Sequence, residues 1–291
     1  MTGVGYRKFR RIISLLISMA LYAASSAWRR ILVLCGIPPR ATCVVIYYHA
    51  IGDKERQAFA RQMDMVCRMT TPIAIDRMEP LQAGERYSAI TFDDGFENAI
   101  RNAIPELMNR SIPATVFVTA DLLGECAQWW PEPALERHEL LASVERLRQL
   151  PAGLICIGSH TLTHPRLPAL TEFDARRELL QSRIKLEELL NRKVTTFSFP
   201  FGDFNQELIN WCRDAGYERV FTTLPQMAFS TATEFAVGRV STEPSDWPLE
   251  FRLKLLGAYR WLPFAYSVKR VILACLFGRK VRRLETGFSQ N

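Results

Sequence analysis

The sequence predicts a parallel α/β barrel, because strand-like and helix-like segments alternate through its middle part. Seven apolar runs rich in Val, Ile and Phe have the length of buried strands. These runs are 43–48, 88–93, 114–119, 154–158, 195–199, 218–223 and 235–240. Five longer stretches between them have the character of helices, at 55–70, 97–110, 134–150, 171–192 and 205–215. Seven such units predict a distorted (β/α)7 barrel with its polar site at the carboxyl ends of the strands.

Local signals support the limits of these helices. Thr171 followed by Asp174 has the form of a helix start, since a hydroxyl there accepts from a free backbone N–H. Asn205 and Gly216 bracket the next helix in the same way, as an N-cap and a C-terminal glycine. The chain of 291 residues, 48% hydrophobic, is long enough to bury a full core.

Charge is distributed unevenly along the chain. The first 40 residues hold seven Lys or Arg and no acid, and residues 246–291 hold nine against three. We therefore expect a basic, apolar segment at 1–40, an α/β domain at 41–245 and a basic helical extension at 246–291. Since the middle is net acidic, the pattern argues against nucleic-acid binding and favours contact of both ends with an anionic membrane surface.

The N-terminal segment has an apolar stretch, 12–27, with basic residues on both sides. Sixteen residues are short for a membrane span, which needs ~20. A helix lying in the interface, monotopic or peripheral, fits this pattern. A cleaved signal is the alternative, because Ser25-Ser26-Ala27 imitates a signal-peptidase site.

The C-terminal extension alternates apolar residues with Arg and Lys over 247–277, and a basic cluster follows at 279–283. This pattern predicts amphipathic helices on a membrane, or helices packed on the barrel whose cations reach water. Seven cysteines without CxxC spacing indicate reduced thiols and favour the cytoplasmic side of the membrane. An extracytoplasmic, membrane-tethered domain is the alternative.

Two short motifs point to chemistry. Asp93 and Asp94 follow an apolar run and precede Gly95, while His160 and His164 are four residues apart after another such run. One carboxylate and two imidazoles form a common ligand set for a catalytic divalent metal, and the spare carboxylate then suits a general base. Taken singly, the first motif also fits a turn, and the second a pair of surface or core histidines.

With these motifs, the chain resembles the polysaccharide deacetylases, carbohydrate esterase family four, which have the NodB-homology fold. The resemblance spans about residues 43–241 and includes a third motif, Phe197-Ser198-Phe199-Pro200-Phe201-Gly202. It implies that Asp93 is the general base and that Asp94, His160 and His164 hold the metal. It also implies that Pro200 and Phe201 line the oxyanion and substrate site, with the Phe201 N–H as donor.

The chain also departs from the family pattern. No Leu-x-His motif follows residue 203, and Ser198 or Phe197 stands where many members carry a base-orienting Arg. Tyr48-His49 resembles the opening of the poly-N-acetylglucosamine deacetylase branch, which makes His49 the candidate acid. A loop-capping His is the alternative. Arg239 is a candidate replacement for the missing Arg at the substrate site, or a salt-bridged surface residue.

Trp129 and Trp130 follow the strand at 114–119 and are placed to shape a carbohydrate cleft, with Trp130 as a substrate residue, or to pack over the rim. The resemblance implies a metal-dependent hydrolase that removes an N-acyl group from an amino sugar. Zn²⁺ is the expected cofactor, with Co²⁺, Ni²⁺ or Mn²⁺ as alternatives. We expect a lipid-linked sugar of cell-envelope polysaccharide or glycolipid biosynthesis as substrate. The alternatives are an extracellular polymer and a non-catalytic membrane adaptor.

Overall fold

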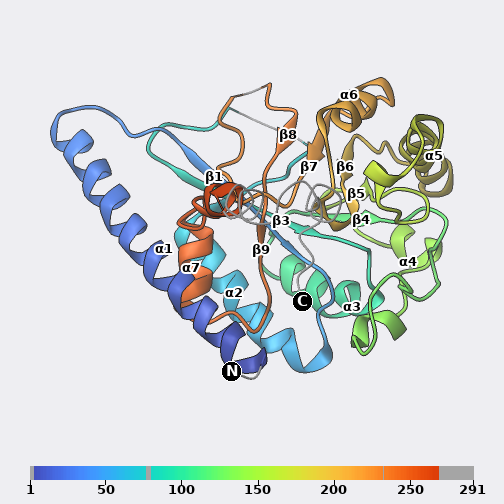
Figure 1. Cartoon of the computed structure of the whole chain (residues 1–291), viewed down its shortest axis with the longest axis horizontal. Helices are drawn as coiled ribbons and strands as arrows, with labels where there is room; N and C mark the ends of the chain where they lie inside the picture. The colour runs from blue at the N-terminus through green and yellow to red at the C-terminus, as the bar shows by residue number, and fades with distance from the viewer. Residues whose placement is uncertain (1–2, 77–79, 232, 269–291) are drawn as a thin grey trace, which may run out of the picture.

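A twisted sheet of parallel strands forms the centre of the protein (Figure 1). The computed structural model describes residues 3–76, 80–231 and 233–268. The strands lie in the order β8-β7-β6-β5-β4-β3-β1-β9, and the short β2 also pairs with β3. Their bounds are β1 Thr42–Tyr48, β2 Thr71–Pro72, β3 Arg86–Phe92, β4 Ala114–Val118, β5 Ile155–Ser159, β6 Thr196–Ser198, β7 Arg219–Phe221, β8 Ala236–Val237 and β9 Val240–Ser241. The arrangement is a parallel α/β half-barrel, in agreement with the predicted fold class at this level.

Helices follow the strands and cover the outside of the sheet. They are α2 Arg56–Met69, α3 Glu97–Met108, α4 Val144–Arg148, α5 Glu172–Leu190 and α6 Gln206–Asp214. Short 3-10 turns lie at η1 Asp53–Glu55, η2 Leu135–His138, η3 Leu167–Ala169 and η4 Pro200–Gly202. Two further helices flank the barrel side by side, α1 Gly3–Leu34 and α7 Pro248–Leu255 (Figure 1).

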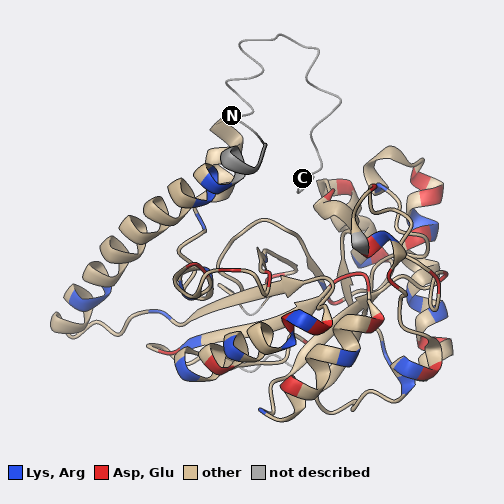
Figure 2. Cartoon of the chain, turned by 90° about the horizontal axis from the view of Figure 1, so that it is seen from below, with Lys and Arg blue, Asp and Glu red and all other residues tan. Residues whose placement is uncertain are grey.

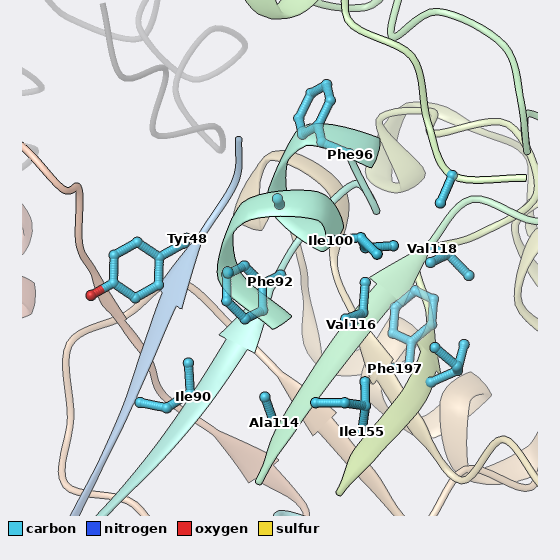
Figure 3. Packing of buried hydrophobic residues seen from close by; sticks show 14 of the residues in the cluster. Tyr48, Ile90, Phe92, Phe96, Ile100, Ala114, Val116, Val118, Ile155 and Phe197 are labelled. Atoms are coloured by element: carbon cyan, nitrogen blue, oxygen red, sulfur yellow. The ribbon is translucent and has the colours of Figure 1, made fainter. Parts of the chain in front are cut away.

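The core has two layers, because alternate residues of a strand point to opposite faces. Val44, Ile46 and Tyr48 of β1 belong to the large cluster between sheet and helices. Figure 3 shows that layer, with Phe92, Val116 and Ile155 under Ile100 of α3. The smaller cluster, which includes Cys43, Val45, Ala89, Phe117, Phe221 and Val237, fills the other face inside the half-barrel.

Three sequence predictions need correction. The strand expected at 235–240 is two strands, β8 and β9, separated by Gly238 and Arg239. Since β8 and β9 are the two ends of the sheet order and not hydrogen-bonded neighbours, the barrel is open there. The helix expected at 134–150 is only η2 and α4, with a bridge-forming segment between them. Apart from these corrections, α1 extends past the apolar stretch 12–27 at both ends.

Half of the predicted C-terminal extension, 269–291, lies outside the described residues, including Lys269, Arg270 and the basic cluster at 279–283. Its described half, 246–268, includes α7, which packs against α1 and α2. The six described cysteines carry free thiols. One helix in the described part, Lys8–Leu34, is long and apolar enough to cross a membrane. This is weak evidence, since a signal sequence near the N-terminus has the same properties.

Candidate metal centre and active site

The two motifs meet at the carboxyl ends of the strands. Asp93 and Asp94 follow β3, and His160 follows β5. The backbone continues the sheet pattern here, because the Asp93 N–H donates to Tyr48 O at 2.9 Å and the His160 N–H donates to Val118 O at 2.9 Å. This places groups from β1, β3, β4 and β5 at one edge of the sheet, where open α/β sheets hold their sites.

Asp94, His160 and His164 form a buried cluster. Their ligand atoms lie within 4.8 Å of one another. Asp94 Oδ1 is 3.4 Å from His160 Nε2 and 3.2 Å from His164 Nε2. Burial alone would raise the pKa of Asp94, but the two imidazoles hold that pKa well below its usual range. Asp94 is therefore an ionised carboxylate in contact with two ring nitrogens.

The protonation chemistry of this cluster fits a divalent cation. His160 Nδ1 lies 2.8 Å from the Ser198 carbonyl oxygen, which only accepts, so Nδ1 carries the proton. In the neutral ring, Nε2 then directs a lone pair toward Asp94. Burial lowers the pKa of His164 despite the nearby carboxylate, which favours its neutral form too. His160 Nε2, His164 Nε2 and an Asp94 carboxylate oxygen thus converge, and two neutral imidazoles with one carboxylate form a set that binds Zn²⁺ and related metals.

The loops that carry these groups depend on left-handed backbone. Asp94, Thr161 and His164 have φ values of 67°, 73° and 59°, which side-chain-bearing residues rarely adopt. Gly95, at φ 78°, allows close packing as well, because a Cβ there would lie 2.7 Å from Val118 Cγ1. Such strain concentrates at functional sites, where the surrounding structure holds it in place.

Glu178 of α5 hydrogen-bonds to the loop between His160 and His164. It is buried and accepts from the N–H groups of Leu162 and Thr163 at 2.8 and 3.1 Å, and from Thr163 Oγ1 at 2.8 Å. Sequence reasoning missed this residue. The sequence did contain an indication of its burial. Glu178 lies three residues after Ala175 and four before Ser182, on the face of α5 that is buried.

Arg239 forms a fully buried, two-pronged ion pair with Asp93. Its Nη1 and Nη2 lie 2.7 Å from Asp93 Oδ1 and Oδ2, and the same guanidinium donates to Ser198 Oγ at 2.7 Å and to Thr91 Oγ1 at 3.1 Å. Burial alone would raise the pKa of Asp93, but the Arg239 charge lowers it below its ordinary value. Asp93 is therefore held ionised and fixed in orientation.

This geometry corrects the interpretation of Arg239 as a salt-bridged surface residue, because its side chain has no exposed area. For the same reason, Arg239 does not line the space open to a substrate. It reaches Ser198, the region where the resemblance expects a base-orienting Arg, from the gap between β8 and β9. An Arg between apolar residues of a strand-like run was the sequence signal for burial.

Aromatic rings surround the metal-ligand cluster. The Trp130 indole N–H donates to Asp94 Oδ2 at 3.1 Å, so the second carboxylate oxygen is occupied. Trp129 stacks on His164 with ring centres 4.1 Å apart. The half-buried His49 meets Trp130 edge to face at 5.4 Å and lies close enough to lower the pKa values of Asp93 and Asp94. The structure thus brings His49 to the site from the end of β1.

The third motif lies on the other side of His164. Phe201, at φ 59° within η4, meets the His164 ring at 4.6 Å between centres, and the Arg166 guanidinium covers the Phe201 ring at 4.3 Å. Arg166 also pairs with the buried Asp203. Pro200 is buried at the start of this turn. The turn that carries Phe201 is therefore held beside the histidines from both faces.

The fold and this cluster define a class: α/β half-barrel proteins with an Asp-His-His cluster that could hold a metal ion. Residues 81–220 match the family model described as polysaccharide deacetylase, a family whose members generally use a divalent metal. The family suggests an N-deacetylase hydrolase.

Two sequence relatives are named as deacetylases, and two solved structures share the fold. The chain is 28% identical over 211 residues to YxkH of Bacillus subtilis, named as a candidate polysaccharide deacetylase. The aligned region covers 69% of this chain and 71% of YxkH. It is 27% identical to the peptidoglycan-N-acetylmuramic acid deacetylase PdaC of Bacillus subtilis, over 47% of this chain and 26% of PdaC. The fold resembles IcaB from Ammonifex degensii (TM-score 0.60, 23% identity, 74% of this chain and 99% of that one). It also resembles the Streptococcus pyogenes deacetylase PplD (TM-score 0.61, 18% identity, 75% and 99%).

Proposed function

We propose that this protein is a metal-dependent hydrolase that removes an N-acyl group, most simply acetyl, from an amino sugar. One observation carries the proposal: the Asp94-His160-His164 cluster adjoins the buried Asp93–Arg239 ion pair at the strand ends. A ligand set alone fits a structural ion. A second, ionised carboxylate beside it supplies the proton acceptor that hydrolysis needs.

In this proposal Asp94, His160 and His164 hold the ion. When bound, the metal polarises the acyl carbonyl and lowers the pKa of water, and zinc is the expected metal. Asp93 accepts the proton of the attacking water through a lone pair that Arg239 leaves free, since each carboxylate oxygen has two. Arg239 acts through Asp93, so it is a positioning residue.

Further groups complete the proposed mechanism. The Phe201 N–H, in the turn beside His164, donates to the oxyanion as charge develops there, and buried Pro200 fixes that turn. His49 donates a proton to the leaving amine, because it reaches the site from β1 and shares the field of both carboxylates. Trp130 supports Asp94 and, with its half-buried ring, borders the substrate space.

The proposed substrate is a lipid-linked amino sugar of cell-envelope biosynthesis, with the domain on the cytoplasmic face of the membrane. The exposed apolar helix α1 and the free thiols of the described cysteines support this choice. PdaC, named for an action on peptidoglycan, favours a polymer as the second candidate, although this chain covers only 26% of PdaC.

A mass-spectrometric assay tests the proposal. Detergent-purified protein is incubated with an isoprenoid-phosphate-linked N-acetylhexosamine or a soluble N-acetylhexosamine oligosaccharide, with and without zinc, and Asp93→Asn is the control. Loss of one acetyl mass from the lipid-linked sugar alone, dependent on zinc and on Asp93, is the expected result. Loss only from the oligosaccharide moves the enzyme to polymer modification. Loss from neither, with metal bound, contradicts the deacetylase assignment for these sugars.

A further inference from the structure

The helix α1 has two faces of opposite character. Its half-buried or buried positions include 11, 15, 18, 22, 25 and 29, spaced alternately by four and three residues. This spacing forms one continuous stripe along a helix. The stripe carries polar groups, among them Arg11, Ser18, Tyr22 and Arg29, whereas a soluble amphipathic helix turns its apolar side to the protein. The polarity of α1 is therefore reversed.

Specific contacts fasten this stripe to the body of the protein. Arg11 donates to Glu250 at 2.6 Å and to the Ser245 carbonyl at 3.0 Å, and its guanidinium lies 4.4 Å from the Trp247 ring centre. Ser18 Oγ accepts from the Trp261 indole N–H at 2.9 Å.

The middle and far end of the stripe are attached as well. Leu15 and Tyr22 pack on the small cluster of Leu253, Ala258 and Tyr259. Near the other end, Arg29 donates to the Gly84 carbonyl. The attachment therefore runs from Arg11 to Arg29, which is about 27 Å of helix at ~1.5 Å per residue.

The outward face of α1 between residues 12 and 28 holds no charge. Every exposed residue of this stretch is apolar: Ile12, Ile13, Leu16, Ile17, Met19, Ala20, Leu21, Ala23, Ala24, Ala27 and Trp28. Basic residues, Lys8, Arg10 and Arg30, lie exposed just beyond both ends. Figure 2 shows α1 with its Lys and Arg near the two ends and none along the middle. An exposed apolar face of this extent indicates an interaction surface.

We infer that α1 lies flat in an anionic membrane surface, with this outward face in the acyl layer of one leaflet. If α1 crossed the membrane, the domain attached along its length would also enter the hydrocarbon layer. The charged surface of that domain makes this orientation unfavourable. A second copy of the chain fits the face less well. Antiparallel pairing of two α1 helices sets the basic ends against each other, whereas anionic headgroups neutralise them.

Vesicle flotation tests the inference. Detergent is removed from the full-length protein in the presence of vesicles of zwitterionic lipid, either pure or mixed with anionic lipid. We expect flotation that increases with anionic lipid. Ile13→Glu with Leu16→Glu should lower the apparent affinity by more than about tenfold, because two apolar contacts with lipid are lost. Phe173→Glu, at an equally apolar exposed position on α5, should float like the wild type.

Three results would overturn the inference. The wild type fails to float, or the double Glu variant floats equally well while its circular dichroism and melting temperature match the wild type. In the third result, light scattering shows that the wild type is a dimer without detergent and that the double Glu variant is a monomer. This would assign the outward face of α1 to contact with a second copy of the chain.

Quenching by brominated lipids separates a flat helix from a spanning one. The Trp28→Phe variant keeps five other tryptophans and serves as the reference. In that background, the quenching added by Leu16→Trp or by Ala27→Trp reports the depth of the helix centre or of its end. A flat helix gives both indoles maximal quenching from bromines at the same acyl position. A spanning helix gives deep quenching at 16 and shallow quenching at 27, and contradicts the inference. Neither measurement depends on deacetylase activity.

Discussion

The strand-end site and the α1 flank depart from ordinary burial in opposite directions. The site buries charge: Asp93, Asp94 and Arg239 are almost fully inaccessible to water. The α1 flank exposes apolar residues, with Leu16 58% and Trp28 62% accessible. The first arrangement is stable because each buried charge has a partner, and the second is favourable only where another apolar phase covers it. Both departures coincide with the features proposed to act, the strand-end cluster in a reaction and the α1 face at a membrane surface.

Substitutions at the strand-end site should have the largest effects. Asp93→Asn should reduce turnover by at least ~10²–10⁴-fold, since a positioned proton acceptor contributes about that much. His160→Ala should abolish metal binding, whereas Asp93→Asn should keep the metal. Atomic emission of the purified variants measures the metal, and the mass-spectrometric assay of acetyl loss measures turnover. An Asp93→Asn enzyme with normal turnover contradicts the base assignment.

Arg239→Gln tests the buried ion pair through its effect on the stability of the protein. It leaves Asp93 buried without its charge partner, so the free energy of unfolding should fall by about 3–5 kcal/mol near pH 7. Because Arg239 lowers the folded-state pKa of Asp93, its stabilisation is present above the ordinary Asp pKa and lost as pH falls through the lowered value. Urea unfolding at pH 7 and in acid should therefore show a smaller difference in acid. Equal differences at both pH values would argue that the ion pair is not the cause.

Trp130→Phe tests whether the aromatic loop belongs to the site. It removes the indole N–H that holds Asp94 Oδ2 and keeps an aromatic ring. Loss of such a support of a ligand typically weakens metal affinity about 10–100-fold. Competition with a chelator measures this affinity. In the same competition, His49→Ala should keep the wild-type metal affinity, while its turnover of the acylated sugar should be slower. Trp129→Phe is the matched control, because it conserves the stacking on His164 and removes no bond to Asp94.

Arg11→Ala gives the smallest expected effect and tests the α1 flank. The Glu250 contact and the Trp247 stacking, both partly exposed, should together contribute about 1 kcal/mol after screening by water. Limited proteolysis in detergent should cut α1 faster in this variant, while vesicle flotation persists because the outward face is unchanged. Lys8→Ala, at an exposed neighbouring position, should leave the proteolysis rate at the wild-type value.

Sequence alone predicted the alternation of strands and helices well, since the main strands are apolar runs whose burial follows directly from composition. β1, β3 and β4 lie within two residues of the expected ranges. The prediction failed at 235–240, where Gly238 and Arg239 interrupt the pairing. It also failed at 134–150, where local helix propensity competes with a loop that bridges to the first motif. Both errors occur where tertiary contacts override local preference.

For the candidate site, residue types and local spacing were enough to single out Asp93, Asp94, His160 and His164, because both motifs follow strand-like runs. The pairing of Arg239 with Asp93 joins residues 146 positions apart, and that of Arg11 with Glu250 joins residues 239 apart. Composition and periodicity carry no information about such contacts. Only the folded chain decided them, because sheet register and helix packing bring these charges together, and their mutual stabilisation in a dry environment then fixes which groups pair.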